Sequence, residues 1–252
     1  MIGIIARHEC ILLLRSMQTW LIAAIVSAVF GCLFAFQLDA FLSAQDQLSR
    51  SDHPVGLSGF MAVRYMEPLS LLFSIIAPLF AMRSFSSEFR QETFVLWQSA
   101  PVSGITLVTG KFFGLMMVLS ALAILASSLL LLMRIFVPID APLISSALLG
   151  LLLCTAMSTA CGLYFSSLTK QALVAVTGSL ALIILLWMLG SVSSQSMSIE
   201  WAQSLSVANH LRGFFQGYIK SNDIAYFLLL TGLFLSLTIV QIDSLRYRSH
   251  KS

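Results

Sequence analysis

Charged residues are scarce in this sequence. Only 10% of its 252 residues are charged and 58% are hydrophobic, whereas a soluble domain usually carries about 25% charged residues. So few charges do not cover a water-facing surface, which excludes an ordinary soluble domain and makes membrane lipid the expected solvent. The net charge is only +3 and the basic residues are scattered, so nothing indicates a nucleic-acid partner.

Motifs of catalysis and nucleotide binding are also missing. The sequence contains no G-x-S-x-G, H-E-x-x-H or G-x-x-x-x-G-K-[ST] pattern, so the chain does not bind ATP through a phosphate loop. Its apolar stretches carry no series of acids and histidines typical of a proton relay. We interpret the four cysteines as apolar side chains in helices: Cys10, Cys32, Cys154 and Cys161. We therefore predict no catalytic, cofactor-binding or metal-binding residue.

Long apolar stretches dominate the rest of the sequence. A bilayer core of about 30 Å needs roughly 20 apolar residues in a helix, and only helices or closed barrels span lipid. No barrel-like alternation is present. Six stretches qualify: 19–36, 65–82, 112–133, 143–165, 172–190 and 224–242. We predict an all-α, polytopic membrane protein with six transmembrane helices and one domain over residues 1–252.

The basic residues indicate an orientation. With both termini in the cytoplasm, the cytoplasmic segments hold nine of them: Arg7, Arg15, Arg83, Arg90, Lys111, Lys170, Arg246, Arg248 and Lys251. The outer segments then hold five: Arg50, Arg64, Arg134, Arg212 and Lys220. Because basic residues accumulate in cytoplasmic loops, we expect both termini inside and a location in the bacterial inner (cytoplasmic) membrane.

Four segments outside the spans have distinct patterns. Residues 1–18 suit an N-terminal helix at the membrane interface, or a simple basic flank. The polar residues 37–64 are expected to form a flexible loop outside. Residues 191–222 mix polar residues with Trp201, Phe214 and Phe215, so they suit short helices that cap the outer mouth of the bundle or re-enter it. Residues 83–101 carry the most distinctive chemistry.

An amphipathic helix is predicted over residues 83–101. Ser84 is a candidate cap, Glu88 is favoured near the N-terminus by the helix dipole, and Ala100-Pro101 ends the helix. Aromatic side chains flanked by Arg and Glu make good interface anchors. The helix is therefore either a docking element for a cytoplasmic partner or an interfacial helix that shields the floor of the bundle.

The segment from Arg83 to Lys111 resembles the permease subunits of type-2 ABC exporters. The pattern matches at these residues: Arg83, Glu88, Thr93, Leu96, Ala100-Pro101-Val102-Ser103 and Gly110-Lys111. It departs from the usual pattern at Ser87, Glu92 and Val95. Two shorter matches are Ser166-Ser167-Leu168-Thr169 with Gln171, and His210 with Phe214 and Gly217. The segment is most similar to the gliding-motility and nitrous-oxide-reductase-maturation branch.

The resemblance implies a permease that pairs with a second permease copy or a homologous permease, within membrane lipid, and binds a cytoplasmic ABC ATPase. ATP and Mg²⁺ would be bound by that partner, with no cofactor in this chain. The implied ATPase-coupling residues are Arg83, Glu88, Arg90, Thr93, Leu96, Trp97 and Pro101. The predicted outer gate comprises Trp201, His210, Phe214 and Phe215.

Two alternatives to an exporter permease remain from the sequence. One is an intramembrane scaffold or assembly factor that handles a lipid or lipoprotein without a true pore. The other is an intramembrane enzyme, which the shortage of polar residues in the spans disfavours. The scarcity of charge in the spans also makes an apolar or amphipathic cargo easier to accommodate than a highly charged one.

Overall fold

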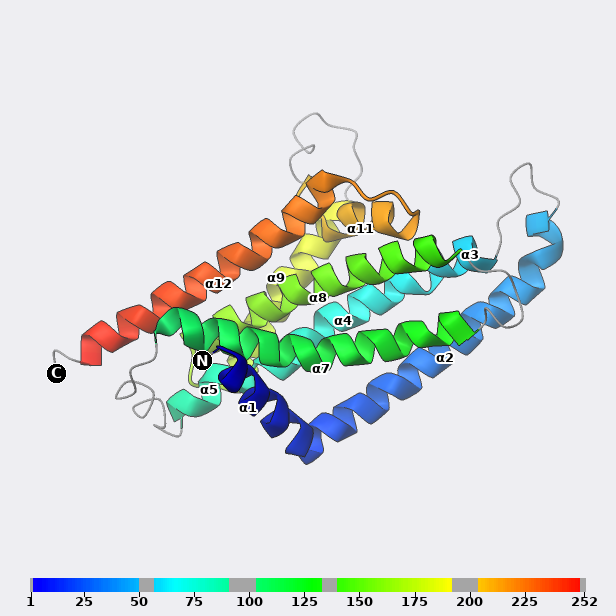
Figure 1. The fold of residues 1–252 in the computed structure, drawn as a ribbon. Helices are drawn as coiled ribbons and strands as arrows, with labels where there is room; N and C mark the ends of the chain where they lie inside the picture. The colour runs from blue at the N-terminus through cyan, green and yellow to red at the C-terminus, as the bar shows by residue number, and fades with distance from the viewer. Residues whose placement is uncertain (1, 50–56, 91–102, 133–139, 192–203, 250–252) are drawn as a thin grey trace.

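The computed structural model describes residues 2–49, 57–90, 103–132, 140–191 and 204–249. Within these ranges the chain is helical, with no strand (Figure 1). The helices are α1 (Ile2–Arg15), α2 (Met17–Ser49), α3 (Leu57–Arg64), α4 (Met66–Ala81), α5 (Arg83–Arg90), α7 (Gly104–Leu132), α8 (Ala141–Leu168), α9 (Ala172–Met188), the short 3₁₀ helix η2 (Leu189–Ser191), α11 (Val207–Phe215) and α12 (Ser221–Ser249).

Five stretches of these helices are long and apolar enough to cross a membrane. They are Thr19–Ala44, Gly59–Ser86, Gly104–Leu130, Ala141–Leu168 and Ser221–Leu245. The sixth predicted span corresponds to α9, a shorter apolar helix of 17 residues that extends about 25 Å at 1.5 Å per residue. The prediction of an all-helical polytopic membrane protein is therefore confirmed.

Helix α8 lies in the middle of the bundle and packs against α4, α7, α9, α11 and α12. It contains no charged residue, and two of its glycines meet neighbours at very short range. A Cβ at Gly162 would lie 2.9 Å from the Pro78 backbone of α4, and one at Gly150 would lie 2.8 Å from Phe214 of α11. Small residues allow helices to approach closely in membranes, where packing drives association.

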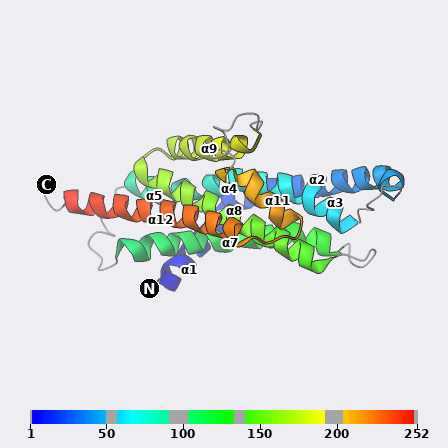
Figure 2. The ribbon, with the colours of Figure 1, turned by 90° about the horizontal axis from the view of Figure 1, so that it is seen from above.

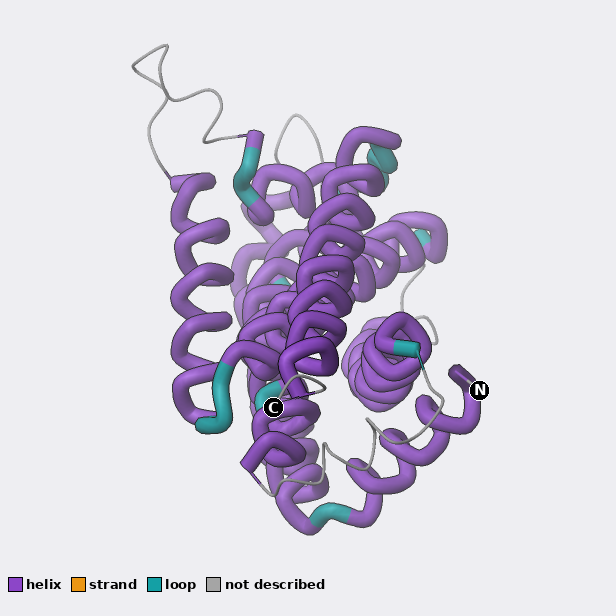
Figure 3. The backbone as a smooth tube through the Cα atoms, turned by 90° about the vertical axis from the view of Figure 1, so that its left-hand side faces the viewer, coloured by secondary structure: helices purple, strands orange, loops and turns teal. Residues whose placement is uncertain are grey.

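Two helices flank this centre on opposite sides. Figure 2 shows α9 along one edge of the bundle and α1 beyond the opposite edge. The view in Figure 3 shows the same separation, with the N-terminal helix at the right. Much of α2 and α12 is exposed, including Trp20, Ile25, Leu229 and Val240. These apolar surfaces suit contact with lipid or with another membrane chain.

Helices α3, α4 and α5 form one interrupted span. Pro68 has no N–H and therefore leaves the Arg64 carbonyl without its usual helical donor. The helix turns at Tyr65 and resumes with Pro68 in the first turn of α4, where proline is tolerated. A second turn, at Met82, separates α4 from α5.

The prediction that residues 37–64 form a flexible loop is wrong for most of that segment. Helix α2 continues to Ser49, and α3 occupies Leu57–Arg64. Alanine, leucine and glutamine in this segment are good helix formers. The rings of Phe41 and Phe60 also meet with centroids 5.5 Å apart, which joins α2 to α3. Polar composition alone therefore did not indicate a loop.

Candidate functional site

A buried lysine joins three helices at the end of the bundle that carries α5. Lys111 of α7 is only 2% exposed. Its Nζ lies 2.8 Å from Oε1 of Glu88 on α5 and 3.2 Å from Oε1 of Glu9 on α1. The same ammonium donates to the Ser84 carbonyl at 3.0 Å and lies 5.3 Å from the centre of the Phe85 ring. We call Glu9, Ser84, Phe85, Glu88 and Lys111 the Lys111 cluster.

The contacts of the Lys111 cluster are those that a buried charge needs. A charge removed from water is costly unless ion pairs and hydrogen bonds replace its hydration. Lys111 has three donors, and the two carboxylates and the Ser84 carbonyl accept from it. Glu9 also accepts from the Ser84 hydroxyl at 3.2 Å. The start of α7 is thereby joined to both α1 and α5 by polar contacts.

Glu88 is held in this cluster against the cost of its own burial. Burial raises the pKa of the Glu88 carboxyl, Lys111 lowers it, and the nearby Glu9 charge raises it; the net direction is upward. A carboxyl with a raised pKa in the folded state contributes most stability below its unfolded value. That contribution is lost as pH rises through the raised pKa. Lys111 is therefore the partner that favours the ionised form of Glu88 against the effect of burial.

Ser166, near the end of α8, fixes the junction between α4 and α5. Its hydroxyl accepts from the backbone N–H groups of Phe85 and Ser86, both at 3.1 Å, and donates to the Met82 carbonyl at 2.9 Å. These N–H groups lie in the first turn of α5, where the helix offers no acceptor of its own. Ser166 thus caps α5 from a distance, which gives a structural reason for the Ser166-Ser167 sequence match.

Helix α1 packs tightly on α7 beside the Lys111 cluster. A Cβ at Gly110 would lie 2.7 Å from the Ile5 side chain. One at Gly114 would lie 2.8 Å from the Glu9 Cβ and 2.9 Å from the Ala6 carbonyl oxygen. Glycines four residues apart form one flat face on a helix, as in other close helix pairs in membranes. This contact places Glu9 within reach of Lys111.

The structure brings together only some of the predicted coupling residues. Glu88 lies in the Lys111 cluster, whereas Arg83 is exposed at the start of α5. Arg90 ends α5, and its side chain is not described. The other predicted coupling residues, Thr93, Leu96, Trp97 and Pro101, lie outside the described residues, as does the predicted helix beyond Arg90.

Glu9 and Lys111 were not predicted as a pair. Lys111 was named only as a basic residue of a cytoplasmic segment and as part of the Gly110-Lys111 match. A signal was present in both cases, because Lys111 is a lone charge in an apolar stretch and Glu9 is an acid directly before one. Such charges in a membrane protein usually have a partner. The sequence did not show that their partners lie on each other's helices, about a hundred residues apart.

A second structured region, which we call the cap, lies at the opposite end of α8. The cap comprises α11 and the turn 216–220. Helix α11 begins at Ser206, whose hydroxyl accepts from the Asn209 N–H, and buries Leu211, Phe214 and Phe215. Ser146 of α8 donates to the Phe214 carbonyl at 2.7 Å.

The cap therefore matches the predicted capping helix in its buried apolar residues. Leu205, which comes before the cap, has a side chain that is 40% exposed. Trp201 of the predicted outer gate lies outside the described residues. Gly217, in the turn after α11, has a φ of 81°, which a residue with a side chain rarely adopts.

His210 attaches the cap to the last span. Its Nδ1 lies 2.6 Å from Oδ1 of Asp223 on α12, and its Nε2 lies 2.9 Å from the Ser204 carbonyl oxygen. The imidazole stacks on the Tyr226 ring, with centroids 4.0 Å apart, and the Tyr226 hydroxyl donates to the Leu205 carbonyl at 2.6 Å. His210 and Asp223 are both buried.

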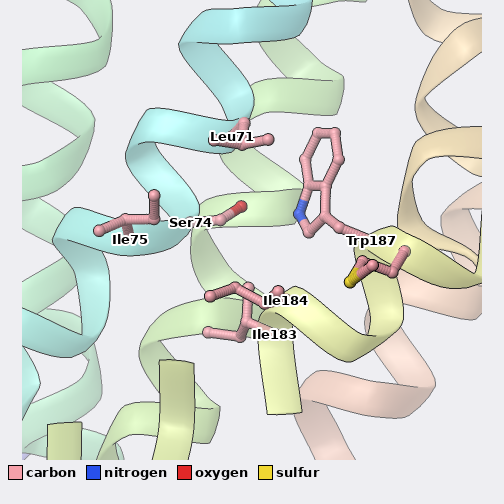
Figure 4. Close-up of a pocket in the computed structure, with 7 residues that line it drawn as sticks. Leu71, Ser74, Ile75, Ile183, Ile184 and Trp187 are labelled. Carbon is pink, nitrogen blue, oxygen red and sulfur yellow. The ribbon is translucent and has the colours of Figure 1, made fainter. Parts of the chain in front are cut away.

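A small apolar cavity of about 280 Å³ lies between α4 and α9 (Figure 4). It is lined by Leu71, Ser74, Ile75, Ile183, Ile184, Trp187 and Met188. The Trp187 indole nitrogen is buried and has no hydrogen-bond acceptor among the described residues. In Figure 4 this nitrogen is on the side of the ring that faces Ser74. The cavity therefore combines an apolar lining with one unused donor.

Among the described residues, no group of three or more His, Cys, Asp or Glu side chains is arranged to hold a metal ion. A comparison with curated proteins finds no match. The family model described as ABC-2 family transporter protein matches residues 4–240, nearly the whole chain. The match includes the Lys111 cluster, Ser166 and the cap. The chain belongs to the ABC-2 transporter family and is a multi-pass membrane permease of that family.

Proposed function

We propose that this permease is an exporter subunit, driven by a separate cytoplasmic ABC ATPase that binds the ATP and Mg²⁺. The Lys111 cluster is the observation that carries the proposal. It joins α5, at the family's docking position, to α1 and to α7 by buried polar contacts. A movement imposed on α5 is therefore transmitted to these helices.

The proposed mechanism uses two contact routes from α5 into the bundle. The first runs through Glu88 and Lys111 into α7, and through Glu9 into α1. The second runs through Ser166 into α8, which packs against the cap at its other end. ATP binding by the partner shifts the permease between two conformations only if its contacts with α5 differ between them.

The exposed part of the coupling surface is proposed to include Arg83, with Arg90, Thr93, Leu96, Trp97 and Pro101 continuing it. Glu88 is assigned a different task, because its carboxylate faces Lys111 inside the protein. We therefore place Glu88 among the residues that position α5, and the basic and aromatic residues among those that contact the ATPase.

The cap is proposed as the outer gate, with both termini in the cytoplasm of a bacterial inner membrane. Trp201, His210, Phe214 and Phe215 form this gate, of which the last three lie in α11. The working unit pairs this chain with a second copy or a homologous permease, within membrane lipid. The cavity beside Trp187 supports an amphipathic cargo, because its lining is apolar and its indole N–H offers one donor.

Charge reversal on α5 tests the proposal. The permease is purified from its native membranes, with mild cross-linking, as wild type, Arg83→Glu and Arg212→Glu. Both arginines are exposed, one on α5 and the other on the cap. We expect an ABC ATPase to co-purify with the wild type and with Arg212→Glu, and several times less with Arg83→Glu.

Equal recovery of the ATPase with all three proteins would contradict the assignment of α5 as the docking element. Recovery of no ATPase with the wild type would favour the alternative, an intramembrane scaffold or assembly factor that handles a lipid or lipoprotein. ATP-dependent release of a lipid or amphipathic compound from wild-type membranes separates an exporter from a scaffold that binds an ATPase.

A further inference from the structure

His210 makes two hydrogen bonds that together require two ring protons. Its Nε2 faces a backbone carbonyl oxygen, that of Ser204, and its Nδ1 faces a carboxylate oxygen, that of Asp223. A carbonyl oxygen accepts but does not donate, so the Nε2 position carries a proton. An ionised carboxylate also only accepts, so a second proton lies between Nδ1 and Oδ1.

The proton count holds wherever the second proton resides. With an ionised Asp223, His210 is an imidazolium; with a neutral imidazole, Asp223 is protonated. In either form the pair holds one more proton than a neutral histidine beside an ionised aspartate. A neutral histidine has one donor and one acceptor, so it would turn an acceptor nitrogen toward one of these two oxygens.

We infer that His210 and Asp223 form a proton-dependent latch, which holds the cap closed on the last span and loosens it when the pair loses its shared proton. The latch joins α11 and the preceding residues Ser204 and Leu205 to the first turn of α12. The latch lies on the same side of the membrane as the cap that it holds. Its release does not require the ATPase.

Asp223 is the charged residue that pairs with His210. The only ion pair of His210 among the described residues is with Asp223, and Tyr226 is the titratable side chain stacked on its ring. On the other elements packed against α11, α8 and α9 carry no charged residue. The other charged residues on the described elements around His210 are Arg64 on α3, Glu67 on α4, Arg212 on α11 itself, Lys220 in the turn, and Asp243, Arg246 and Arg248 on α12. Among the described side chains, none of these forms a salt bridge with His210.

Loss of the proton leaves a buried carboxylate facing a nitrogen lone pair. Asp223 is 7% exposed and His210 is 9% exposed, so water does not readily replace the missing bond. The penalty for a buried polar group without its partner is larger when the group is charged. The cap is therefore held most firmly while the pair keeps its shared proton.

The test uses full-length protein in nanodiscs, with its four native cysteines replaced and one new cysteine in the cap. Leu211→Cys reports on the closed cap, since Leu211 is 1% exposed. Tyr218→Cys is the matched reference, since Tyr218 is 69% exposed and lies in the following turn. Both variants are labelled with an impermeant thiol reagent from pH 5.5 to 8.5. Dividing the labelling rate of Leu211→Cys by that of Tyr218→Cys removes most of the pH dependence of the thiol itself. We expect the ratio to rise about tenfold with pH, the factor expected for losing one charged hydrogen bond.

Asp223→Asn gives the sharpest comparison. An asparagine amide donates as well as accepts, so it can donate to Nδ1 of a neutral His210 while Nε2–H still bonds Ser204. We expect Asp223→Asn to hold the cap closed with a flat labelling ratio across the range. Asp243→Asn, at the far end of the same helix, should keep the wild-type rise.

Two results would overturn the latch. One is a flat wild-type ratio while Tyr218→Cys labels normally, which needs no Asp223 variant to be folded. The other is an Asp223→Asn profile that rises as steeply as the wild type, which would assign the pH response to a different group.

Discussion

The two ends of this bundle attach a short helix to a span in similar ways but with different chemistry. At one end Lys111 holds α5 and α1 through two carboxylates. At the other, His210 of the cap pairs with a single carboxylate of α12. Lysine keeps its charge throughout the physiological pH range, whereas histidine changes charge within it. The Lys111 cluster therefore joins its helices through a cation with three acceptors, whereas the proposed latch depends on one proton shared by His210 and Asp223.

The largest effect is expected from Lys111→Met, which removes the charge and keeps an unbranched side chain that is one atom shorter. Glu9 and Glu88 would then face each other without a cation, and breaking a buried ion pair costs about 3–5 kcal/mol. We expect a clear loss of thermal stability in detergent. Lys170→Met, at an exposed position between α8 and α9, is the matched control and should leave stability unchanged.

Neutralising all three charges should reverse most of that loss. A buried charge network replaced as a whole by neutral groups is often tolerated, so Lys111→Met combined with Glu9→Gln and Glu88→Gln should be more stable than Lys111→Met alone. If the triple variant is as unstable as the single one, shape rather than charge holds these helices together.

A smaller loss is expected from Gly114→Val, which tests the packing of α1 on α7. The new side chain would meet the Ala6 carbonyl and the Glu9 side chain, and overpacking of this kind typically costs about 1–3 kcal/mol. Gly232→Val on α12 is the control, since its Cβ would meet nothing within 4 Å. The measurement is the midpoint temperature of thermal unfolding of the two variants. Equal midpoints would contradict the close contact between α1 and α7.

The smallest effect is expected from Ser166→Ala. The first turn of α5 would lose the acceptor of two backbone N–H groups, at about 1–2 kcal/mol, as for removal of a helix cap. Faster hydrogen exchange should be confined to the start of α5. Ser236→Ala is the control, because its hydroxyl is exposed and bonds within its own helix. Hydrogen exchange that becomes faster across the whole bundle would instead indicate global destabilisation.

The sequence predicted the spans better than it predicted the contacts between them. The length of the apolar stretches was sufficient to predict five helices that are long enough to span a membrane, and the sixth predicted stretch forms the 17-residue α9. The prediction of a loop over residues 37–64 was wrong because the good helix formers in this segment and the Phe41–Phe60 contact outweigh its polar composition. The family match confirms the ABC-2 transporter family but does not distinguish the gliding-motility and nitrous-oxide branch, which stays a prediction.

The candidate site was predicted in part. Glu88 was named from the sequence as a coupling residue, and the structure places its carboxylate beside Lys111; its role in coupling stays a prediction. Its partner was not predictable, because Lys111 and Glu9 come from distant segments and meet only through the glycine face of α7. The burial of Phe214 was predictable from composition, whereas the His210–Asp223 pair depends on the turn at 216–220, in which Gly217 has a positive φ.

The central claim is that α1, α5 and α7 move together when the partner ATPase binds ATP. The most direct test measures distances between spin labels in the complete complex, with and without trapped nucleotide, in a chain without its native cysteines. Labels at Ile4 of α1, Ile105 of α7 and Leu185 of α9 all occupy exposed positions. The account predicts an unchanged Ile4–Ile105 distance while both distances to Leu185 change. A nucleotide-dependent change between Ile4 and Ile105 would contradict it.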